Sequence, residues 1–502
     1  MDRRLSRRNV LRGIMLLGSG AVLAACGGAA PTATSAPAAA ATSAPAAATA
    51  TPVPAEATAT TAPAAAATAA PAAATPTAAA AATSAPAAVD TGGAKSIEVW
   101  NNNWGEEYNA PMKLIGDQFT QDTGVTVNWT FNDDWQEKLL TAIAGGVPPD
   151  ATYTNWVGLP TLAFQDSLLP LDDYMASSGI KDSDFIKATI DACKWQGKTY
   201  AMPGGADFLV LFYSKDVYTA AGLDPEAPPK TLDEWVAHSE KIYQTDAQGN
   251  YIRMGMAPTD PGNPYLEPLF GGKWYDPDAQ KVTCNSKENV DAFTWMLGNC
   301  KKWDPQKVAA FTAGTPGYSQ PNSGFATGKV AYLANEGFWA AEALDKYAPD
   351  LKYGITFTPT LKGTPEERKN YCIQGWDYSI PKGAKQIKAG WAFIKYAFYD
   401  KSVDMGVKTL NGNCVLSHMD DFNKGVEAWL GPNNRMTPYF HIFTETGAAG
   451  EVFWPVMPVA SRYFDEMNRA QDFISRGEKT PQQALDECAQ IVQSELDKAL
   501  KG

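Results

Sequence analysis

The sequence predicts an α/β protein that contains two domains. Segments with the alternation or the apolar runs of strands are followed by segments with helical spacing, and this order indicates sheets covered by helices. The pattern begins near residue 95 and starts again after about residue 205. The region 95–502 is also long enough that two domains are expected.

The first unit of the pattern has the order strand, helix, strand, helix, strand. Ser96–Trp100 alternates apolar and polar residues, as a half-buried strand does. Gly145–Asp150 carries the Gly and Pro residues of a turn. Three strands with helices between them predict a parallel sheet with helices on its faces. The strands are expected at residues 96–100, 125–129 and 151–154, and the helices at residues 110–121 and 135–144.

The second unit begins with Phe208–Tyr213, an apolar run that suits a buried strand. Thr231 and Glu234 have the spacing of a capping box, so a helix is expected from there to about Gln244. Thr480-Pro481 signals the start of a last helix. Its spacing predicts one apolar face made of Leu485, Cys488, Val492, Leu496 and Leu500. Two α/β units leave a cleft between them, and ligands of such sheets bind beyond the carboxyl ends of the strands.

The chain begins with an export signal. Five arginines precede an apolar stretch, 14–25, that is shorter than the roughly 20 residues of a membrane-spanning helix. Ser6–Arg12 resembles the twin-arginine signal, and Leu23–Cys26 resembles the lipobox of bacterial lipoproteins. The second resemblance implies cleavage after residue 25 and a diacylglyceryl group on Cys26. We therefore expect a lipoprotein that is held at the outer face of the cell membrane.

Residues 26–94 are expected to form a disordered tether behind that anchor. The stretch from Ala29 to Gly93 is nearly all Ala, Thr, Pro and Ser, and its only charged residue before Asp90 is Glu56. Such a composition buries too little apolar surface to offset the entropy of ordering the chain. Proline at irregular intervals also prevents a long alanine helix.

The charge and the cysteines limit the possible partners. The formal charge is −13, and removal of residues 1–25, with five Arg and one Asp, makes it −17. An acidic body argues against nucleic acid, whose binding depends on basic patches. Six cysteines follow Cys26 without a CxxC pair, so neither zinc nor any other cofactor is expected. Disulfides and free buried thiols both remain open, and Cys284 with Cys300 is the first pair to test.

The sequence contains no histidine metal site, no nucleophile elbow and no complete P-loop. The three histidines lack metal-binding spacing, and there is no GxSxG elbow. Gly197-Lys198-Thr199 looks like the end of a P-loop, but Ala192 stands where its first glycine would be. Glycoside hydrolysis needs only two carboxylates and stays an alternative. The carboxylates considered for it are Asp207, Glu267, Glu336 and Asp377.

Seven segments of the body, in order along the chain, carry a family resemblance. They are 119–127, 145–150, 195–203, 212–216, 228–234, 353–359 and 453–454. Together they resemble the extracellular solute-binding proteins of ABC importers, in the carbohydrate-binding group that is similar to maltose-binding protein. Ser214 and Leu232 depart from that pattern, which has Asn and Trp there.

The resemblance implies a two-lobed periplasmic-binding-protein-like fold of type II, with a hinge and a ligand cleft. Three crossovers are expected near Asp207, Ile355 and His418. The expected lobes are 95–206 plus 361–417 and 207–360 plus 418–502. The implied function is that of a monomer, not an enzyme, which captures a sugar or short oligosaccharide by lobe closure and delivers it to permease subunits.

The candidate ligand contacts follow predicted strands or match family positions. Trp104, Glu106, Asn132, Asp133, Asn155 and Trp156 follow the first three strands, and Asp134 is weighed with them as a helix cap. The resemblance adds Asp207, Tyr265, Glu267, Trp339, Trp376, Asp377 and Trp454. Aromatic rings cover the C–H faces of a sugar, and carboxylates and amides accept from its hydroxyls.

The basic ligand residues of maltose-binding protein have no match here, so a neutral or cationic ligand is favoured and a phosphorylated one is not. Aldoses, short oligosaccharides and polyamines all suit an acidic, Trp-rich cleft. Three alternatives stay open: binding of a polyamine or other small polar solute, a secreted glycoside hydrolase, and a binding protein that reports to a membrane sensor.

Overall fold

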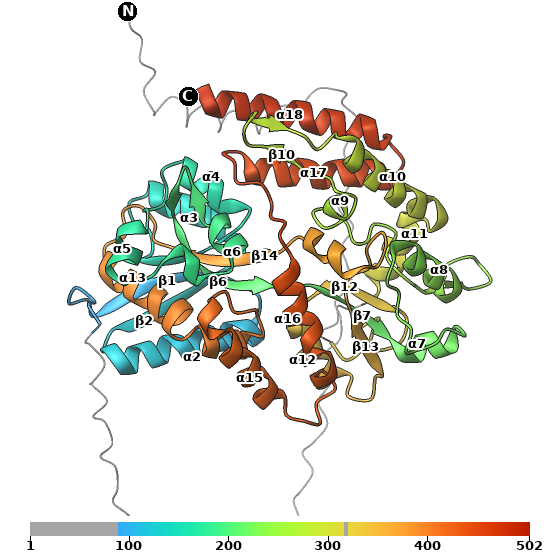
Figure 1. Ribbon diagram of the computed structural model, residues 1–502, viewed down its shortest axis with the longest axis horizontal. Helices are drawn as coiled ribbons and strands as arrows, with labels where there is room; N and C mark the ends of the chain where they lie inside the picture. Colours follow the sequence, from blue (N-terminus) through green and yellow to red (C-terminus); the bar gives the residue numbers. More distant parts are fainter. Residues whose placement is uncertain (1–88, 316–319, 502) are drawn as a thin grey trace, which may run out of the picture. The chain divides into compact units, whose positions relative to one another are not determined.

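The computed structural model describes residues 89–315 and 320–501 (Figure 1). The predicted signal peptide, Cys26 and the tether up to residue 88 lie outside the described residues. None of the helices within the described ranges is long and apolar enough to cross a membrane. The body is an α/β fold with two lobes, each of which has its own sheet.

Lobe one is built on a five-stranded sheet of order β2-β1-β3-β14-β6. Its strands are β1 (Ser96–Asn102), β2 (Thr126–Asn132), β3 (Ala151–Asn155), β6 (Ala201–Asp207) and β14 (Gln374–Ser379). β1 pairs in parallel with β2 and β3, as predicted. β14, from much later in the chain, is antiparallel to both β3 and β6.

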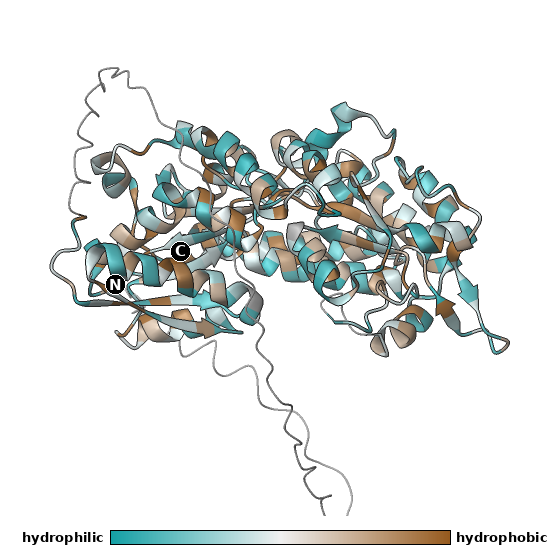
Figure 2. Ribbon diagram, turned by 90° about the horizontal axis from the view of Figure 1, so that it is seen from below, coloured by the Kyte–Doolittle hydropathy of each residue, from teal (hydrophilic) through white to brown (hydrophobic). Residues whose placement is uncertain are grey.

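Helices cover both faces of this sheet. They are α2 (Glu106–Thr123), α3 (Trp135–Ala144), α4 (Gly158–Phe164), α5 (Asp172–Ser177), α6 (Lys187–Ala192), α13 (Ile387–Lys395) and α14 (Ser402–Thr409). Ile97 and Val99 of β1 are buried with Met112, Ile115 and Phe119 of α2. Figure 2 shows the result: helices carry teal, hydrophilic residues beside brown, hydrophobic ones, as amphipathic helices do.

Lobe two has a three-stranded sheet of order β12-β7-β13. β7 (Val210–Ser214) lies in the centre, and β12 (Tyr332–Glu336) and β13 (Tyr353–Thr356) are both antiparallel to it. The expected strand at 208–213 is therefore confirmed. The unit does not repeat the parallel arrangement of lobe one.

The apolar run of β7 is explained by burial on both faces. Val210 and Phe212 lie in one hydrophobic cluster, and Leu211 and Tyr213 lie in another. Successive side chains of a strand point to opposite faces, so a strand covered on both sides needs a continuous apolar run. The covering helices are α7 (Lys215–Ala220), α8 (Leu232–Ile242), α12 (Phe338–Tyr347), α15 (Met419–Leu430) and α16 (Phe440–Ala449).

The predicted capping box starts α8. Thr231 Oγ1 accepts from the Glu234 amide at 3.1 Å, and Glu234 Oε2 accepts from the Thr231 amide at 3.2 Å. Each side chain thereby satisfies a backbone donor that the first helical turn leaves free.

The last two helices pack together rather than forming a tail. α17 (Ala460–Ser475) and α18 (Pro481–Lys501) lie against α10 (Lys287–Lys302), which is preceded by α9 (Leu266–Leu269) and followed by α11 (Pro305–Ala313). Four residues of the predicted apolar face of α18 are at most 2 % exposed. The fifth, Leu500, is 41 % exposed, because it lies in the last turn of the helix beyond its packing partners.

The described cysteines after the tether are all buried, free thiols. The first pair to test, Cys284 with Cys300, is not joined, since the two sulfurs have different partners. Cys284 Sγ lies 3.6 Å from the Leu485 carbonyl, whereas Cys300 Sγ lies 3.7 Å from the Pro258 carbonyl.

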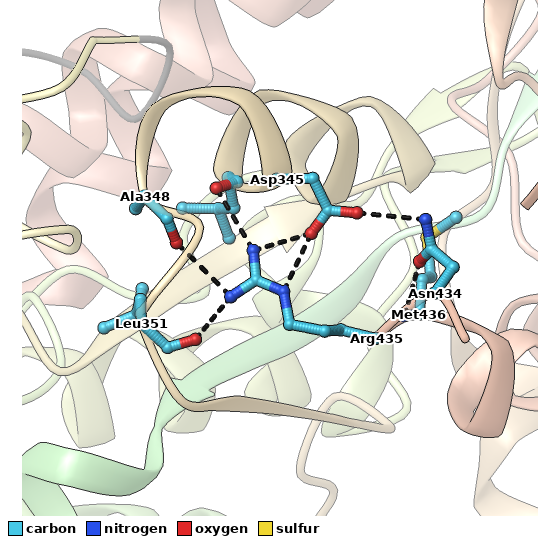
Figure 3. Close-up of polar contacts among 7 residues, drawn as sticks. Asp345, Ala348, Leu351, Asn434, Arg435 and Met436 are labelled. Atoms are coloured by element: carbon cyan, nitrogen blue, oxygen red, sulfur yellow. Dashed lines mark hydrogen bonds and ion pairs between the residues drawn. The ribbon is translucent and has the colours of Figure 1, made fainter.

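Arg435 fixes the end of α12 (Figure 3). Its guanidinium donates to Asp345 Oδ1 at 2.6 Å and to the Ala348 and Leu351 carbonyls, and a further bond reaches the Leu344 carbonyl. Carbonyls in the last turn of a helix have no partner within the helix, and a cation there also suits the helix dipole. Arg435 therefore holds the C-terminal end of the helix whose first turn carries Trp339.

Candidate functional site

A cavity of about 670 Å³ lies where strands of lobe one meet helices of lobe two. Its volume is in the usual range for small-molecule sites, about 300–1,000 Å³. The lining residues are Trp104, Tyr108, Gln136, Tyr153, Asn155, Trp156, Val157, Asp207, Trp339, Gln374, Gly375, Trp376, Asn411, Ser461, Phe464 and Asp465. Aromatic and amide side chains dominate this set.

Trp104 follows β1 and forms part of an aromatic group. Its ring meets Tyr153 edge-to-face at 5.1 Å and Trp376 at 6.2 Å between centroids. With the Asn102 amide in the orientation that satisfies both of its groups, Asn102 Oδ1 accepts from Trp104 Nε1 at 2.7 Å. The ring is therefore oriented by a neighbour two residues away, and 36 % of the residue remains exposed.

Trp376, in the middle of β14, lies across the backbone of β6. A Cβ atom added to Gly204 or Gly205 would come within 2.6 Å of its ring. β14 pairs with β6 at this point, with Trp376 opposite Gly205. The Gly-Gly pair thus leaves the space that the indole occupies, and any larger residue there would displace it.

Trp339 comes from lobe two. Its indole Nε1 donates to Glu336 Oε2 at 2.9 Å. A Cβ atom on Gly337 would lie 2.3 Å from the Trp339 ring, so this orientation of the ring requires glycine at position 337. Trp339 thus faces the cavity from lobe two, whereas Trp104 and Trp376 face it from lobe one.

Asp207, the last residue of β6, carries a carboxyl group that no described residue pairs. No hydrogen bond or ion pair to its side chain is present among the described residues. Burial, with no cation to counter it, raises its pKa from 3.8 to about 7. The chain enters β7 of lobe two only three residues later, so this carboxyl lies at the crossing between the lobes.

Three residues of α17 form another wall. Ser461, Phe464 and Asp465 have the i, i+3, i+4 spacing of one helix face. Ser461 Oγ lies 3.3 Å from the Val157 carbonyl and 3.4 Å from Thr161 Oγ1, which joins α17 to the start of α4. The Phe464 ring meets Trp156 edge-to-face at 5.7 Å.

Six of the thirteen predicted contacts line this cavity: Trp104, Asn155, Trp156, Asp207, Trp339 and Trp376. Asn155 is partly used by the fold, because its Oδ1 accepts from the Gly158 amide at 2.7 Å at the start of α4. Tyr265 stands behind the cavity, where its hydroxyl accepts from the side-chain amide of the lining residue Gln374.

Three polar candidates near the first two strands lie outside the cavity. Glu106 is exposed at the start of α2 and pairs with Lys113 at 3.1 Å. Asn132 is buried at the end of β2. Asp133 accepts from Asn103 Nδ2 at 2.8 Å, so it holds the loop that precedes Trp104. Contrary to expectation, the structure does not bring these three side chains to the cavity: Glu106 and Asp133 have polar partners elsewhere, and Asn132 ends β2, an edge strand of the sheet.

Three further candidates are core residues. Glu267 is fully buried, and Trp274 Nε1 donates to its carboxyl at 3.2 Å. Asp377 is 3 % exposed and accepts from the Cys193 thiol at 3.2 Å, since alternation along β14 turns it away from the face that carries Trp376. Trp454 is 1 % exposed and donates to the Ala460 carbonyl.

The aromatic contribution of the C-terminal region comes from Phe464 instead of Trp454. The two rings pack edge-to-face at 5.3 Å, with Phe464 toward the cavity and Trp454 beneath it. The helical spacing of Ser461, Phe464 and Asp465 could have indicated this face. The other lining residues that the sequence did not indicate are Tyr108, Gln136, Tyr153, Val157, Gln374 and Asn411.

A larger cavity of about 1340 Å³ lies elsewhere, between the 182–194 segment and α15 and α16. Its lining is mostly apolar. Its charged residues largely pair with one another: Lys194 binds Asp182 at 2.7 Å and Asp191 at 3.3 Å, and Lys187 also pairs with Asp191. The 670 Å³ cavity is lined by tryptophan side chains from both lobes and lies at strand ends of lobe one, so we treat it as the candidate site.

The chemistry available in the site favours recognition. No histidine, lysine, arginine or cysteine is among the described residues that line it, and its charged groups are the carboxyls of Asp207 and Asp465. Within the described ranges no cluster of His, Cys, Asp or Glu could hold a metal ion. What the cavity offers is π-faces, amides and two carboxyl groups.

Comparison with known proteins adds a family match. A profile of the family described as "Bacterial extracellular solute-binding protein" matches residues 101–403, more than half of the chain. A maltotriose-binding protein of Pyrococcus abyssi is 22 % identical over 314 residues, 61 % of this chain and 62 % of that protein. The sn-glycerol-3-phosphate-binding protein UgpB of Escherichia coli K12 is 24 % identical over 270 residues, 51 % of this chain and 58 % of that protein. The match thus spans about three fifths of the length of these curated relatives.

Solved structures share the fold over most of the chain. CpMnBP1 with mannobiose bound is 26 % identical, with a TM-score of 0.67 over 78 % of this chain and 98 % of that one. The substrate-binding protein Lmo0181 of Listeria monocytogenes, in complex with cycloalternan, is 20 % identical with a TM-score of 0.65, over 80 % of this chain and 99 % of that one. At that identity the second likeness concerns the fold alone.

Proposed function

Because this chain belongs to the family of bacterial extracellular solute-binding proteins, we propose that it captures a sugar or short oligosaccharide in the cavity between its lobes. The observation that carries the proposal is the aromatic lining contributed from both sides, with Trp104 and Trp376 from lobe one and Trp339 from lobe two. Flat rings cover the C–H faces of a pyranose, and the amides of Gln136 and Asn411 suit its hydroxyl rim.

The relatives support this substrate class. The names of the maltotriose-binding protein and of CpMnBP1 with mannobiose bound both point to short saccharides. UgpB is named for a phosphorylated solute, whereas the cavity here has no described cationic lining residue to pair with a phosphate. A neutral or cationic ligand therefore remains favoured over an anionic one.

Capture would proceed by lobe closure. A ligand that touches Trp339 as well as Trp104 and Trp376 binds better when the lobes are together, so it shifts the population toward that form. Moving the ratio of forms from 1:99 to 99:1 takes about 5.5 kcal/mol of differential binding. The hinge would lie at the crossings between the lobes, of which Asp207–Val210 is one. The lobe boundaries given above remain predictions.

The remaining parts of the function are also proposals. We expect the loaded form to dock on ABC permease subunits as a monomer, and the chain to be held at the outer face of the membrane through a lipid on Cys26. The family match and the lipobox resemblance support these expectations. We propose binding rather than catalysis, because the matching family and the relatives above are named as binding proteins.

Titration calorimetry of the purified chain tests the proposal. The panel contains mannobiose, maltotriose, cellobiose, sn-glycerol 3-phosphate and spermidine. We expect a saccharide to bind and Trp339→Ala to weaken it tenfold or more, which corresponds to about 1.4 kcal/mol. Trp429→Ala is the matched control, because Trp429 is 48 % exposed on α15 and does not line the cavity.

Two outcomes would contradict the proposal. Binding of spermidine alone would keep the fold and the site but replace the substrate class. Equal loss of affinity in the Trp339 and Trp429 variants would place the ligand elsewhere. Chromatography of the saccharide after incubation separates the hydrolase alternative: products that disappear with Asp207→Asn would show turnover.

A further inference from the structure

The charged residues that line the candidate cavity are both acidic. Asp207 lies at the crossing between the lobes, and Asp465 lies on the wall formed by α17. No Lys, Arg or His belongs to the part of the lining that the structure describes. The site is thus negatively charged wherever its carboxyl groups ionise.

The surroundings of Asp207 leave that charge uncompensated. The titratable groups that interact with its charge are Tyr153 of β3, Tyr265 beside α9, Asp377 of β14 and Cys414. Each of them is neutral or acidic; burial is the main cause that raises the pKa of each, and the negative charge of Asp207 raises it further. Among the described residues no cation faces this carboxyl group.

Aromatic rings stand beside it. Tyr153 interacts with Asp207 and also meets the Trp104 ring at 5.1 Å and the Trp135 ring at 5.0 Å. Trp104 in turn meets Tyr108 at 6.4 Å and Trp376 at 6.2 Å. The negative faces of such rings attract cations within about 6 Å, most strongly where water is excluded.

We propose that the preferred ligand is an amino sugar, whose protonated amine is held by Asp207 beside the aromatic rings of the cavity. The inference rests on the proposed function and narrows its substrate class. A sugar hydroxyl can donate to an ionised Asp207, but it leaves the negative charge in the cavity. A protonated amine donates and also cancels the charge, which removes the cost of burying it.

Binding of the amine would displace the proton that burial favours on Asp207. In the empty cavity burial raises the pKa of Asp207 to about 7. A cation at hydrogen-bonding distance lowers the pKa again, so the affinity for the amine should rise as the pH rises toward 7. A neutral sugar does not cancel the charge, so its affinity should rise less with pH than the affinity of the amine.

Matched sugars test the inference. Glucosamine, galactosamine and mannosamine are each compared with the N-acetyl form and with the parent hexose, and the glucosamine dimer is compared with its diacetyl form and with cellobiose. The members of each set differ only at C2. Affinities are measured on the full chain at pH 7 by calorimetry, with thermal shift as a second readout.

Within the set that binds, we expect the amine to bind at least tenfold more tightly than the hydroxyl form. Asp207→Asn should lower the affinity for the amine at least tenfold more than it lowers the affinity for the parent sugar, so that the preference for the amine is lost. The variant is isosteric, and circular dichroism verifies its fold.

Three results would overturn the inference. In the first, the parent or acetylated sugar binds as tightly as the amine, which leaves the proposed function intact. In the second, Asp207→Asn weakens all three members equally, which makes Asp207 a general hydroxyl acceptor. In the third, no saccharide binds at all, and the proposed function then falls together with the inference.

Discussion

Three indole rings of the cavity are positioned by the protein itself, two by neighbours in the chain and one by the adjacent strand. Asn102 accepts from Trp104, Glu336 accepts from Trp339, and the glycines of β6 leave room for Trp376. Because the Nε1–H groups of Trp104 and Trp339 already donate to Asn102 and Glu336, these two rings offer a ligand only their faces. Fixed rings lose little freedom on binding, which favours affinity.

Asp207 has a testable effect on stability. Its pKa in the folded protein is about 7, above the 3.8 of a free carboxyl group, so the folded state binds the proton more tightly. The stability that this proton contributes is complete below the unfolded pKa and is lost as the pH rises through 7. Each pH unit between the two values is worth about 1.4 kcal/mol.

We therefore expect Asp207→Asn to gain stability relative to the wild type as the pH increases. The difference in Tm should grow from about pH 4 to about pH 7 and then stay constant, because above pH 7 Asp207 is ionised in both the folded and the unfolded state and asparagine does not titrate. Thermal unfolding monitored by circular dichroism measures it. A Tm difference that does not change with pH would contradict the uncompensated charge.

Local order along the chain was enough to place some predicted contacts at the cavity, and their contact with a ligand stays a prediction. Trp104, Asn155 and Trp156 lie at or just beyond strand ends, and strand ends converge on the cavity. Local order could not place Trp454 and Phe464, which lie one above the other, because only helix packing decides which ring faces the cavity. Glu267 and Asp377 are carboxyl groups whose burial against Trp274 and Cys193 has no local signal.

At the scale of elements, α12 connects the stability of lobe two with its contribution to the cavity. Its first turn presents Trp339, and its last turn is held by Arg435. The guanidinium bonds to three backbone carbonyls and one carboxylate, a geometry that a planar fork allows and an ammonium group does not.

Arg435→Ala should destabilise the protein by about 2 kcal/mol, because it removes the charge partner of the half-buried Asp345 and the donor to the Leu351 carbonyl. It should also weaken saccharide binding through the loss of order at Trp339, and Arg435→Lys should restore only part of either effect. Urea unfolding and calorimetry measure the two quantities.

The matched control is Arg476→Ala, which removes an exposed ion pair with Glu478 and should change stability by 1 kcal/mol or less. If Arg435→Ala behaves like Arg476→Ala in both measurements, the cluster in Figure 3 does not support the site.

The sequence predicted where helices and strands lie better than it predicted how the strands pair in the sheets. Helix α3 and the start of α8 lie where periodicity and capping placed them. The antiparallel sheet of lobe two was not foreseen, since an apolar run buried on both faces reads the same in either direction.

At the scale of the whole molecule, we propose that a saccharide binds between two lobes that have separate hydrophobic cores. Lobe one is held by the cluster around β1 and α2, and lobe two by the clusters on either face of β7 with the bundle of α10, α17 and α18. Between them the chain contributes cavity residues from strand ends and from helix starts.

Hydrogen–deuterium exchange with and without a saturating saccharide tests this claim most directly. If the saccharide binds between the lobes, we expect it to slow amide exchange in segments of both lobes. These segments are residues 102–108, 153–157, 336–340 and 461–465. Protection confined to one lobe, or found instead at residues 182–194 and 444–456 around the larger cavity, would contradict it.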